Sequence, residues 1–450
     1  MTAVSDSLIF RHIFSTAESA AIWSDSGRTI YYLRFEASLA IALAKLKIIP
    51  QKAADAIVNK CTIDLIDWDD LRQQTELIGY PVLGVVKQIV KAVNSVEPGL
   101  GKWAHWGATT QDVTDTATVL QLRDTLDLVS ESLDKITSDL RVICDRYKST
   151  PMAARSNLQQ AVPISFGFKM ARLLSTFERH QLRLEQIRSR LLVVEFGGAA
   201  GTLATINEQH AASSTSLAAC VPRQISDSTE RDRIAEVGGY FALLTATCSK
   251  FAFDVKLMMQ TEVGEVSEPY VPHRGSSSTM PQKRNPISCA YITAMSATIR
   301  QLSSALYDAM VEDHERSTGP WEIEWITLPQ ICTLTRATLR QTSDLIAGLE
   351  VYPDAMQKNL AISKGAIVSE AVMMGLGPTL GRQYAHDLVY DLCRRCVQED
   401  KPLLDLLLAD EKVIESQLTK DELTRLCNPI NYLGLSVEMV ERVLKGGGKT

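Results

Sequence analysis

Two long runs of apolar residues, spaced alternately three and four positions apart, constrain the fold of this chain more than any other feature. The first run consists of Val119, Leu122, Leu126, Val129, Leu133, Ile136, Leu140 and Ile143, and the second of Met170, Leu173, Phe177, His180, Leu184, Ile187 and Leu191. This spacing places the apolar side chains along one side of a helix, and long helices with such stripes pack nearly parallel, as in a coiled coil or a bundle. His180 is the polar member, and we interpret it as a core or interface histidine. The sequence therefore predicts a mostly α-helical protein with a central bundle of long helices.

Irregular stretches between the apolar runs indicate how the chain is divided. They fall at residues 101–112, 150–163, 196–201 and 269–286. We find no alternation of apolar and polar residues typical of a substantial sheet, so we expect only short β pieces near the loops. A chain of 450 residues, 45% of them hydrophobic, is long enough for two or three domains. We predict an N-terminal helical domain over residues 1–108, a central long-helix bundle over 109–362 with a signature loop at 272–286, and a C-terminal helical domain over 363–450.

The charge and the cysteine content exclude several classes of protein. A net charge of −6 and a pI near 5.8 do not indicate the basic surface that a nucleic-acid or membrane-surface partner would require. The chain has no apolar run of membrane-spanning length, and Met1–Ala21 lacks a basic start followed by a hydrophobic stretch. Nine scattered cysteines fit reduced thiols better than a disulfide framework, and no His, Cys or Asp cluster has metal-ligand spacing. We therefore expect a cytoplasmic protein with no cofactor, no metal, and no nucleic-acid or membrane partner.

A loop rich in hydroxyl groups, Gly275–Pro286, places three consecutive serines beside two cations and an amide. It directly precedes a helix-compatible stretch. Asn285 and Pro286 form a good helix start, because Asn can cap free N–H groups and Pro loses nothing at the first helical position. A carboxylate or phosphate would fit at the positive end of such a helix. For the serines alone, a surface loop without a ligand is the alternative.

Two further segments also suit an anion. Gly107–Asp112 places hydroxyls and backbone donors at the start of the first long helix, although capping alone would explain one threonine or aspartate. Arg155–Pro163 gathers uncharged donors beside one arginine, although a polar loop ahead of a helix would look similar. Three such segments in one chain favour a shared site for an anionic ligand.

The hydroxyl-rich loop resembles the signature of the fumarase/aspartase superfamily, Gly-Ser-Ser-x-Met-Pro-x-Lys-x-Asn-Pro, with Ser276 at the position of the signature glycine. The resemblance covers nearly the whole chain and is closest to the bacterial-type 3-carboxy-cis,cis-muconate cycloisomerases. It rests also on His105–Asp112, Arg155–Pro163, Glu230–Arg233, Met259–Glu265 and His314–Ser317. It implies a three-domain, mostly α-helical fold whose long helices form a 20-helix core in a homotetramer, with each active site shared between three subunits.

The resemblance also implies the chemistry. A base removes a proton from the carbon next to a carboxylate, and the dianionic intermediate expels or accepts a group on the neighbouring carbon, while fixed donors stabilise the charge. Ser277 matches the family's catalytic serine, Lys283 and Asn285 would hold a carboxylate, and Lys283, Arg284 and the helix N-terminus would favour the Ser277 alkoxide. The substrate would be a small carboxylate, bound by Thr109, Thr110, Ser156, Asn157, Gln159, Gln160, Ser278, Met280, Arg316, Glu230 and Arg28.

Some positions depart from the family pattern. Many members pair a histidine at position 157 with a glutamate at position 290, where this chain has Asn157 and Ala290. The cycloisomerase branch usually has Trp at position 157 and His at position 160, where this chain has Gln160. The His–Glu pair is therefore missing, as it is in the cycloisomerase branch.

Two other changes bear on the substrate. Ser228 and Glu230 replace the branch's usual His and Gln, and a glutamate facing the site would repel a polycarboxylate unless it pairs with a neighbouring arginine. Trp321 and Trp325 stand where adenylosuccinate lyase has a Ser and an Arg that help to hold the nucleotide. Because indole cannot replace them as a phosphate ligand, these tryptophans disfavour a purine-nucleotide substrate.

The sequence thus predicts a β-elimination or addition enzyme that acts on a small polycarboxylate through a carboxylate-stabilised carbanion, similar to 3-carboxymuconate cycloisomerase. The changes at positions 157, 160, 228 and 230 favour the alternative of a divergent C–N or C–O lyase that releases fumarate. A third hypothesis is a non-catalytic scaffold, as in the lens crystallins of this superfamily. Joint retention of Ser277, Lys283, Asn285, Thr109 and Thr110 argues against it.

Overall fold

The computed structural model describes all residues except 1–3, 5–6, 207–220, 223–228, 317–318 and 447–450. Ser228 and Ser317 therefore lie outside the described residues. The chain divides into two compact units. Unit 1 comprises Met1–Ser132, Gln181–Cys248 and Tyr291–Arg340, and unit 2 comprises Leu133–His180, Ser249–Ala290 and Gln341–Thr450. The predicted division at residues 108 and 362 stays a prediction.

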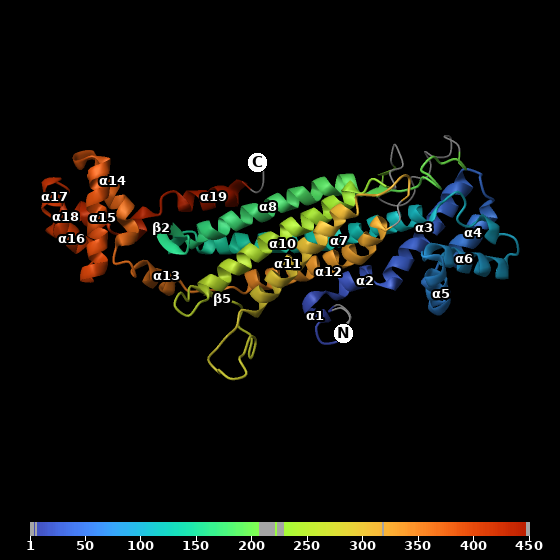
Figure 1. Cartoon of the computed structure of the whole chain (residues 1–450), viewed down its shortest axis with the longest axis horizontal. Coiled ribbons are helices and arrows are strands. Elements are labelled where there is room, and N and C mark those ends of the chain that lie inside the picture. The colour runs from blue at the N-terminus through green and yellow to red at the C-terminus, as the bar shows by residue number, and fades with distance from the viewer. Residues whose placement is uncertain (1–3, 5–6, 207–220, 223–228, 317–318, 447–450) are drawn as a thin grey trace. The chain divides into compact units, whose positions relative to one another are not determined.

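Five long helices contribute residues to both units (Figure 1): α7 (Thr110–Arg146), α8 (Phe166–Leu191), α10 (Asp232–Met258), α11 (Ile287–Asp308) and α12 (Pro320–Ala347). The predicted apolar run of α7 is buried from Val119 through Leu140, and Ile143 at its end is half-buried. Every member of the run on α8 is buried, including His180, which packs against Phe177 with ring centroids 6.2 Å apart. The mostly helical fold and both apolar stripes are therefore confirmed.

Besides its long-helix segments, unit 1 contains these shorter elements: α1 (Arg11–Phe14), α2 (Ala17–Ile22), α3 (Asp25–Lys45), α4 (Gln51–Lys60), η2 (Ile63–Leu65), α5 (Trp68–Ile78), α6 (Val82–Val96), η3 (Gly101–Trp103) and the parallel pair β3 (Val193–Val194) and β4 (Val221–Pro222). Tyr32, Phe35, Ile57 and Ile89 fill a core that also receives Leu120 of α7. This packing of α3, α4 and α6 (blue in Figure 1) against α7 fixes the first turns of α7.

Close approach of α10 and α11 in unit 1 depends on a glycine. A Cβ at Gly238 would lie 2.3 Å from the Cδ1 of Leu306. Glycine inside a helix costs about 1 kcal/mol relative to alanine. Its place here is explained by the packing of Leu306 against the α10 backbone.

Unit 2 carries the antiparallel pairs β1 (Pro151–Ser156) with β2 (Gln159–Ser165) and β5 (Val266–Ser267) with β6 (Glu350–Val351). Its shorter helices are α13 (Pro353–Leu360), η5 (Ala366–Val368), α14 (Ser369–Leu380), α15 (Arg382–Glu399), α16 (Leu403–Ala409), α17 (Glu411–Glu415), α18 (Lys420–Leu426), η6 (Pro429–Tyr432) and α19 (Ser436–Gly446). Leu376, Leu392, Leu403 and Leu407 form a core within the α14–α18 group (orange to red in Figure 1).

The hairpin β1–β2 is one of the short β pieces expected near the loops, but it makes most of residues 150–163 regular and not irregular as predicted. Met152 and Ala153 are buried on β1, but the partners of Arg155 and Gln160 are polar groups of the protein. A strand that buries polar contacts lacks the apolar alternation on which sequence-based recognition depends.

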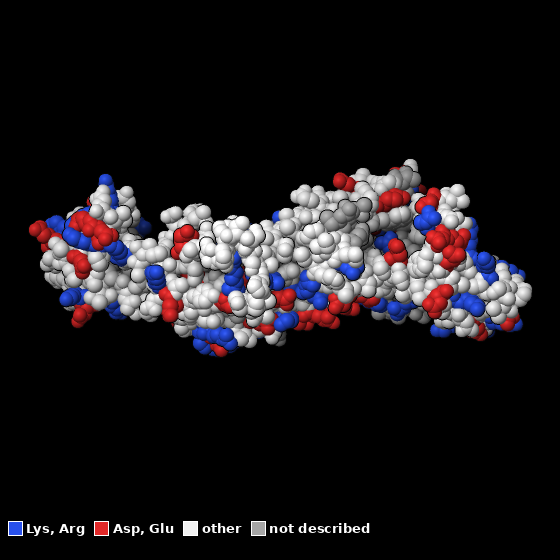
Figure 2. Space-filling model, turned by 90° about the horizontal axis from the view of Figure 1, so that it is seen from below, with Lys and Arg blue, Asp and Glu red and all other residues white. Residues whose placement is uncertain are grey.

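The surface view in Figure 2 shows acidic and basic side chains interspersed over the face that it presents. None of the described helices is both long enough and apolar enough to cross a membrane.

Candidate active site

The signature loop in unit 2 is closed at its neck by backbone contacts. The backbone and side-chain amides of Asn285 both donate to the Gly275 carbonyl, at 2.8 and 2.9 Å. Gly275 has a φ of +73°, and a Cβ there would lie 2.4 Å from the Asn285 carbonyl oxygen. Glycine is therefore required at this turn. The neck fixes both ends of the loop that carries Ser277.

The Ser277 hydroxyl is held by two backbone donors. The N–H groups of Thr279 and Met280 donate to Ser277 Oγ at 3.3 and 3.1 Å. Donors aimed at this oxygen stabilise an alkoxide more than a hydroxyl, so they favour loss of the proton from Ser277. Ser277 is half-buried, whereas Ser278, Met280 and Lys283 are exposed.

The N-terminus of α11 corrects the expectation that Asn285 caps this helix. The Glu268 carboxylate instead accepts the N–H groups of Ser288 and Cys289, at 3.3 and 2.8 Å. Glu268 is buried, and a carboxylate is stabilised at this positive helix end. An internal carboxylate thus occupies the position that the sequence suggested for a bound anion.

Arg284 also differs from its expected role beside Ser277. Its guanidinium lies 3.2 Å from the Glu350 carboxylate, donates to the Glu268 carbonyl, and lies over the Tyr270 ring at 5.4 Å. These contacts fasten the base of the signature loop to β5 and β6. Lys283 remains the loop cation suited to favour the Ser277 alkoxide.

The second predicted segment forms the tip of the hairpin β1–β2. Ser156 pairs with Gln159, so Asn157 and Leu158 make a two-residue turn, with φ values of +51° and +64°. Asparagine tolerates this left-handed backbone, which gives position 157 a conformational reason for its departure from tryptophan. All four residues are exposed.

A network of polar groups fixes the base of this hairpin. Arg155 makes two bonds, of 2.7 and 2.8 Å, to the carboxylate of Glu265, which is fully buried. The Asn359 side chain donates to the same carboxylate at 2.8 Å, and the backbone carbonyl of Asn359 accepts from the Gln160 side-chain amide at 2.8 Å. The charge of Arg155 is therefore matched within the chain, and the Gln160 amide already has a partner.

In unit 1, Asp112 organises the start of α7. Its carboxylate accepts the N–H groups of Thr109 and Gly197 at 2.8 Å each and of Gly198 at 3.1 Å. Burial raises the pKa of Asp112 to about 6, and these hydrogen bonds oppose the rise. The sequence predicts only an irregular stretch at residues 196–201 and gives no sign of the contacts with Gly197 and Gly198. The contact with Thr109 had a local signal, a carboxylate three residues after a threonine at a helix start.

Arg316 and Thr109 are predicted site residues that the structure brings together. Arg316 Nη1 donates to Thr109 Oγ1 at 3.0 Å, and its Nη2 donates to the Ala199 carbonyl at 3.3 Å. Arg316 is exposed, and Thr109 and Thr110 are half-buried. A cation and hydroxyls at the start of a helix form a set of donors that suits a carboxylate.

Arg28 of α3 lies near the same helix. It hydrogen-bonds to the hydroxyl of Tyr32, which also contacts Thr114 of α7. Burial raises the pKa of Tyr32, so this hydroxyl stays protonated. Arg28 is thereby linked to the residue that follows Thr110 by one helical turn.

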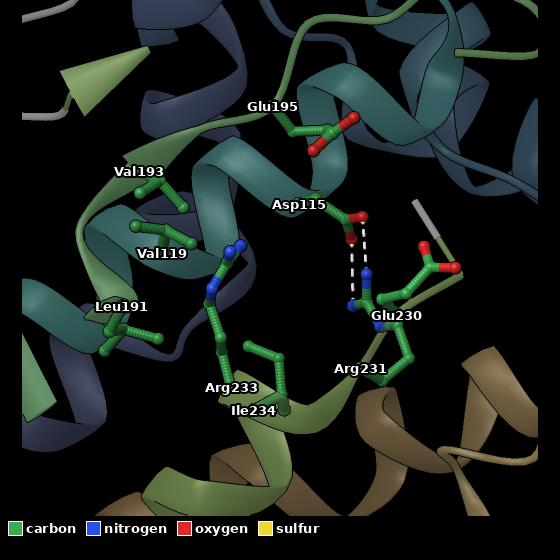
Figure 3. Close-up of a pocket in the computed structure, with 9 residues that line it drawn as sticks. All are labelled: Asp115, Val119, Leu191, Val193, Glu195, Glu230, Arg231, Arg233 and Ile234. Atoms are coloured by element: carbon green, nitrogen blue, oxygen red, sulfur yellow. Dashed lines mark hydrogen bonds and ion pairs between the residues drawn. The ribbon is translucent and has the colours of Figure 1, made fainter. Parts of the chain in front are cut away.

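Glu230 lies at a small cavity in unit 1 that is also lined by Arg231, Arg233, Asp115 and Glu195 (Figure 3). The cavity of about 20 Å³ has room for about one water molecule. It is therefore too small for a polycarboxylate. Glu230 itself is exposed.

Arg231 is buried among three carboxylates. It makes two bonds to Asp115, of 2.7 and 3.1 Å, and two to Glu324, of 2.5 and 2.9 Å. Glu312 lies 3.8 Å away, with its side chain 1% exposed. Burial raises the pKa of Glu312 to about 7, Arg231 lowers it, and the charges of Glu324 and Asp115 raise it further. One guanidinium thus faces three acids, and burial raises the pKa of Glu324 as well as that of Glu312.

Trp321 and Trp325 form an aromatic cluster with Tyr80. The indole centroids are 5.0 Å apart, and each lies 5.8 Å from the Tyr80 ring. The Trp321 Nε1 donates to Asp115 at 3.3 Å. These positions therefore provide packing and one hydrogen bond, and the prediction that they do not bind a phosphate stays a prediction. Within the described part of the chain, no group of three or more His, Cys, Asp or Glu side chains is placed to hold a metal ion.

Comparison with known proteins places these observations in a family. A family model described as Lyase matches residues 11–300, and one described as Adenylosuccinate lyase C-terminus matches residues 365–443. The chain is 55% identical to trans-aconitate decarboxylase 1 of Mycosarcoma maydis, over 96% of this chain and 87% of that protein. It is 40% identical to 3-carboxy-cis,cis-muconate cycloisomerase of Pseudomonas aeruginosa, over 99% of this chain and 97% of that protein.

The fold is also similar to a solved structure. The crystal structure of 3-carboxy-cis,cis-muconate lactonizing enzyme from Pseudomonas putida matches with a TM-score of 0.91 and 36% identity, over 98% of both chains. The predicted resemblance to the cycloisomerase branch is confirmed. The identity to the decarboxylase of Mycosarcoma maydis is nevertheless higher than the identities to these two Pseudomonas enzymes.

Proposed function

The chain belongs to the fumarase/aspartase superfamily of lyases, and we propose that it is an enzyme that decarboxylates a small unsaturated tricarboxylate, with trans-aconitate as the candidate substrate. The 55% identity to trans-aconitate decarboxylase 1 over nearly the whole chain supports this substrate. The observation that best supports a reaction with proton transfer at carbon is the Ser277 hydroxyl, whose oxygen accepts hydrogen bonds from two backbone N–H groups.

The reaction uses the same kind of intermediate that the sequence predicts. In trans-aconitate, loss of CO₂ from the carboxymethyl group breaks one C–C bond. The electron pair shifts through the double bond to a carbon next to another carboxylate, which stabilises the carbanion. A proton from Ser277 Oγ to that carbon gives itaconate. The Thr279 and Met280 N–H groups then stabilise the Ser277 alkoxide until it takes a proton from water.

The other proposed residues surround the substrate, and those with hydrogen-bond donors hold its carboxylates. Lys283, Ser278 and Met280 belong to the signature loop, and Arg316 and Thr109 form a donor pair. The remaining donors of the set are Thr110, Ser156, Asn157, Gln159, Gln160, Asn285 and Arg28. Glu230, the acidic member of the set, cannot hold a carboxylate and would limit which substrates enter. Asn285 and Gln160 already donate within the chain, so we assign them a positioning role. We further propose a homotetramer with a 20-helix core, in which each site combines segments from three subunits.

The proposed reaction can be tested by measuring where the proton added to the product comes from. Itaconate formed from trans-aconitate in D₂O should carry one deuterium in its methylene group next to the carboxylate, measurable by NMR. Ser277→Ala should lower kcat/KM by about 10³-fold, because general acid–base groups contribute about 10²–10⁴-fold. Ser276→Ala is the matched control, since its hydroxyl donates to the His273 carbonyl. A Ser277→Ala loss below about tenfold, about 1.4 kcal/mol, would exclude Ser277 as the proton donor.

Cycloisomerisation of 3-carboxy-cis,cis-muconate is the second candidate, because the 40% identical relative carries that name. Consumption of this diene by the wild type, without CO₂ release from trans-aconitate, would replace our first choice. Release of fumarate from succinyl-amine candidates would instead support the C–N lyase alternative. Folded protein that is inactive in all three assays would leave the non-catalytic scaffold.

A further inference from the structure

We propose that Leu158, at the tip of the hairpin β1–β2, forms the apolar wall against the substrate carboxylate that departs as CO₂. This inference rests on the proposed decarboxylation and on a site shared between copies of the chain. It assigns to Leu158 the choice of which carboxylate is lost.

Leu158 occupies a backbone position that disfavours it. The two-residue turn has positive φ values at both Asn157 and Leu158, as in a type I′ turn, whose preferred sequence is Asn-Gly. Leucine at a φ of +64° brings its Cβ too close to the following carbonyl. The Leu158 side chain is also 76% exposed. Glycine at this position would remove both the backbone strain and the exposed apolar surface. We therefore infer that the leucine side chain itself has a role here.

The hairpin holds this side chain at a fixed place. Directly below the tip, Arg155 is bonded twice to the buried Glu265, and Gln160 is bonded to Asn359, which itself contacts Glu265. These contacts tie both strands to one carboxylate and to the end of α13. Leu158 therefore lies at the tip of a hairpin whose base is fixed by hydrogen bonds and an ion pair.

The neighbours of Leu158 are polar, and this contrast gives the proposal its chemistry. Ser156 and Gln159 flank the turn and are exposed, so they can donate to carboxylates that the product retains. A carboxylate against an apolar side chain loses hydration, which raises its free energy. CO₂ is neutral and weakly hydrated, so it loses little hydration free energy beside Leu158. Contact with Leu158 is therefore more favourable in the transition state than in the ground state, as catalysis requires.

Leu158→Asn tests the proposal, because asparagine has a similar size, tolerates positive φ and is polar. Two reactions are measured on each variant: CO₂ release from trans-aconitate, and exchange of the methylene protons of itaconate in D₂O, which needs Ser277 but involves no departing carboxylate. We expect Leu158→Asn to lower kcat for decarboxylation at least 20-fold and to change the exchange rate less than threefold. Leu158→Gly should behave alike, and both variants should unfold at or above the wild-type temperature. Leu77→Asn, at a residue that is 81% exposed on α5, is the matched control.

The outcomes separate the two proposals. If the wild type releases CO₂ and Leu158→Asn does so within threefold, the role of Leu158 is refuted while the proposed function stands. If decarboxylation and exchange fall together in both variants, Leu158 shapes the whole site and the proposal is also refuted. If the wild type releases no CO₂ from trans-aconitate, the proposed function fails and the role of Leu158 fails with it.

Discussion

Replacement of Glu312 by glutamine should stabilise the protein above neutral pH and change its stability little near pH 5. Glu312 lies close to Asp115, Glu324 and Arg231, with its side chain almost fully buried. Burial raises its pKa from 4.5 to about 7. A carboxyl with a raised pKa binds its proton more tightly in the folded state than in the unfolded state. Its stabilising contribution is therefore complete below about pH 4.5 and is lost as the pH rises to about 7.

The size of the effect follows from the two pKa values. Each pKa unit corresponds to about 1.4 kcal/mol, so the rise from 4.5 to about 7 sets an upper bound of about 3.5 kcal/mol. Glutamine is neutral at every pH and avoids this loss. An unfolding entropy of about 2.1 cal/mol/K per residue gives about 0.9 kcal/mol/K for 450 residues. The variant should therefore melt above the wild type at pH 8.5, by at most about 4 °C.

Scanning calorimetry at one scan rate, from pH 5.0 to pH 8.5, measures this difference in Tm between Glu312→Gln and the wild type. Glu76→Gln is the control, because Glu76 is exposed on α5 in an ion pair with Arg72 that contributes little. A Glu312→Gln protein that is less stable at pH 8.5 would refute the reasoning. That result would mean that an ionised Glu312 is stabilised by Arg231.

Two further changes probe the contacts of unit 1. Arg231→Met removes the guanidinium that Asp115 and Glu324 share, so the free energy of unfolding should fall by about 3–5 kcal/mol at pH 7.5. Calorimetry at pH 5.5 should show a smaller loss. An equal loss at both pH values would contradict the charge argument. Asp112→Asn leaves one acceptor oxygen for three N–H groups, so the free energy of unfolding should fall by about 1–3 kcal/mol. The value of kcat/KM for decarboxylation should fall as well. An unchanged kcat/KM would mean that Asp112 does not support the active site.

The helices were predictable because their signal is local. An apolar stripe on α7 or α8 needs only the spacing of residues within one helix, and Leu126 and Leu184 are buried as that spacing requires. The hairpin β1–β2 was not predictable in this way. Its Arg155 meets Glu265, which follows 110 residues later, and no pattern within the hairpin indicates that partner.

The candidate site shows the same limit. The sequence predicted Ser277 in the signature loop as the catalytic base, which stays a prediction. It did not indicate which charged side chains pair with one another inside the protein. It assigned the start of α11 to Asn285 and a bound anion, whereas Glu268 takes both roles. Asp112 reaches Gly197, which lies 85 residues away, and sequence reasoning offered no reason to join them. Partner choice over such distances is decided by tertiary packing.

The internal carboxylates also determine which donors a substrate can use. Glu265 matches Arg155, and Glu350 matches Arg284. Among the predicted site residues that the structure describes, Lys283, Arg316 and Arg28 form no ion pair with a carboxylate of the described chain; Arg316 donates to Thr109 and Arg28 bonds to Tyr32. In the shared site that we propose, these three cations could each meet one carboxylate of the substrate. The charge count therefore does not single out the carboxylate that leaves. Loss of hydration beside the apolar side chain of Leu158 raises the free energy of the carboxylate that it contacts, so this contact would select the bond that breaks.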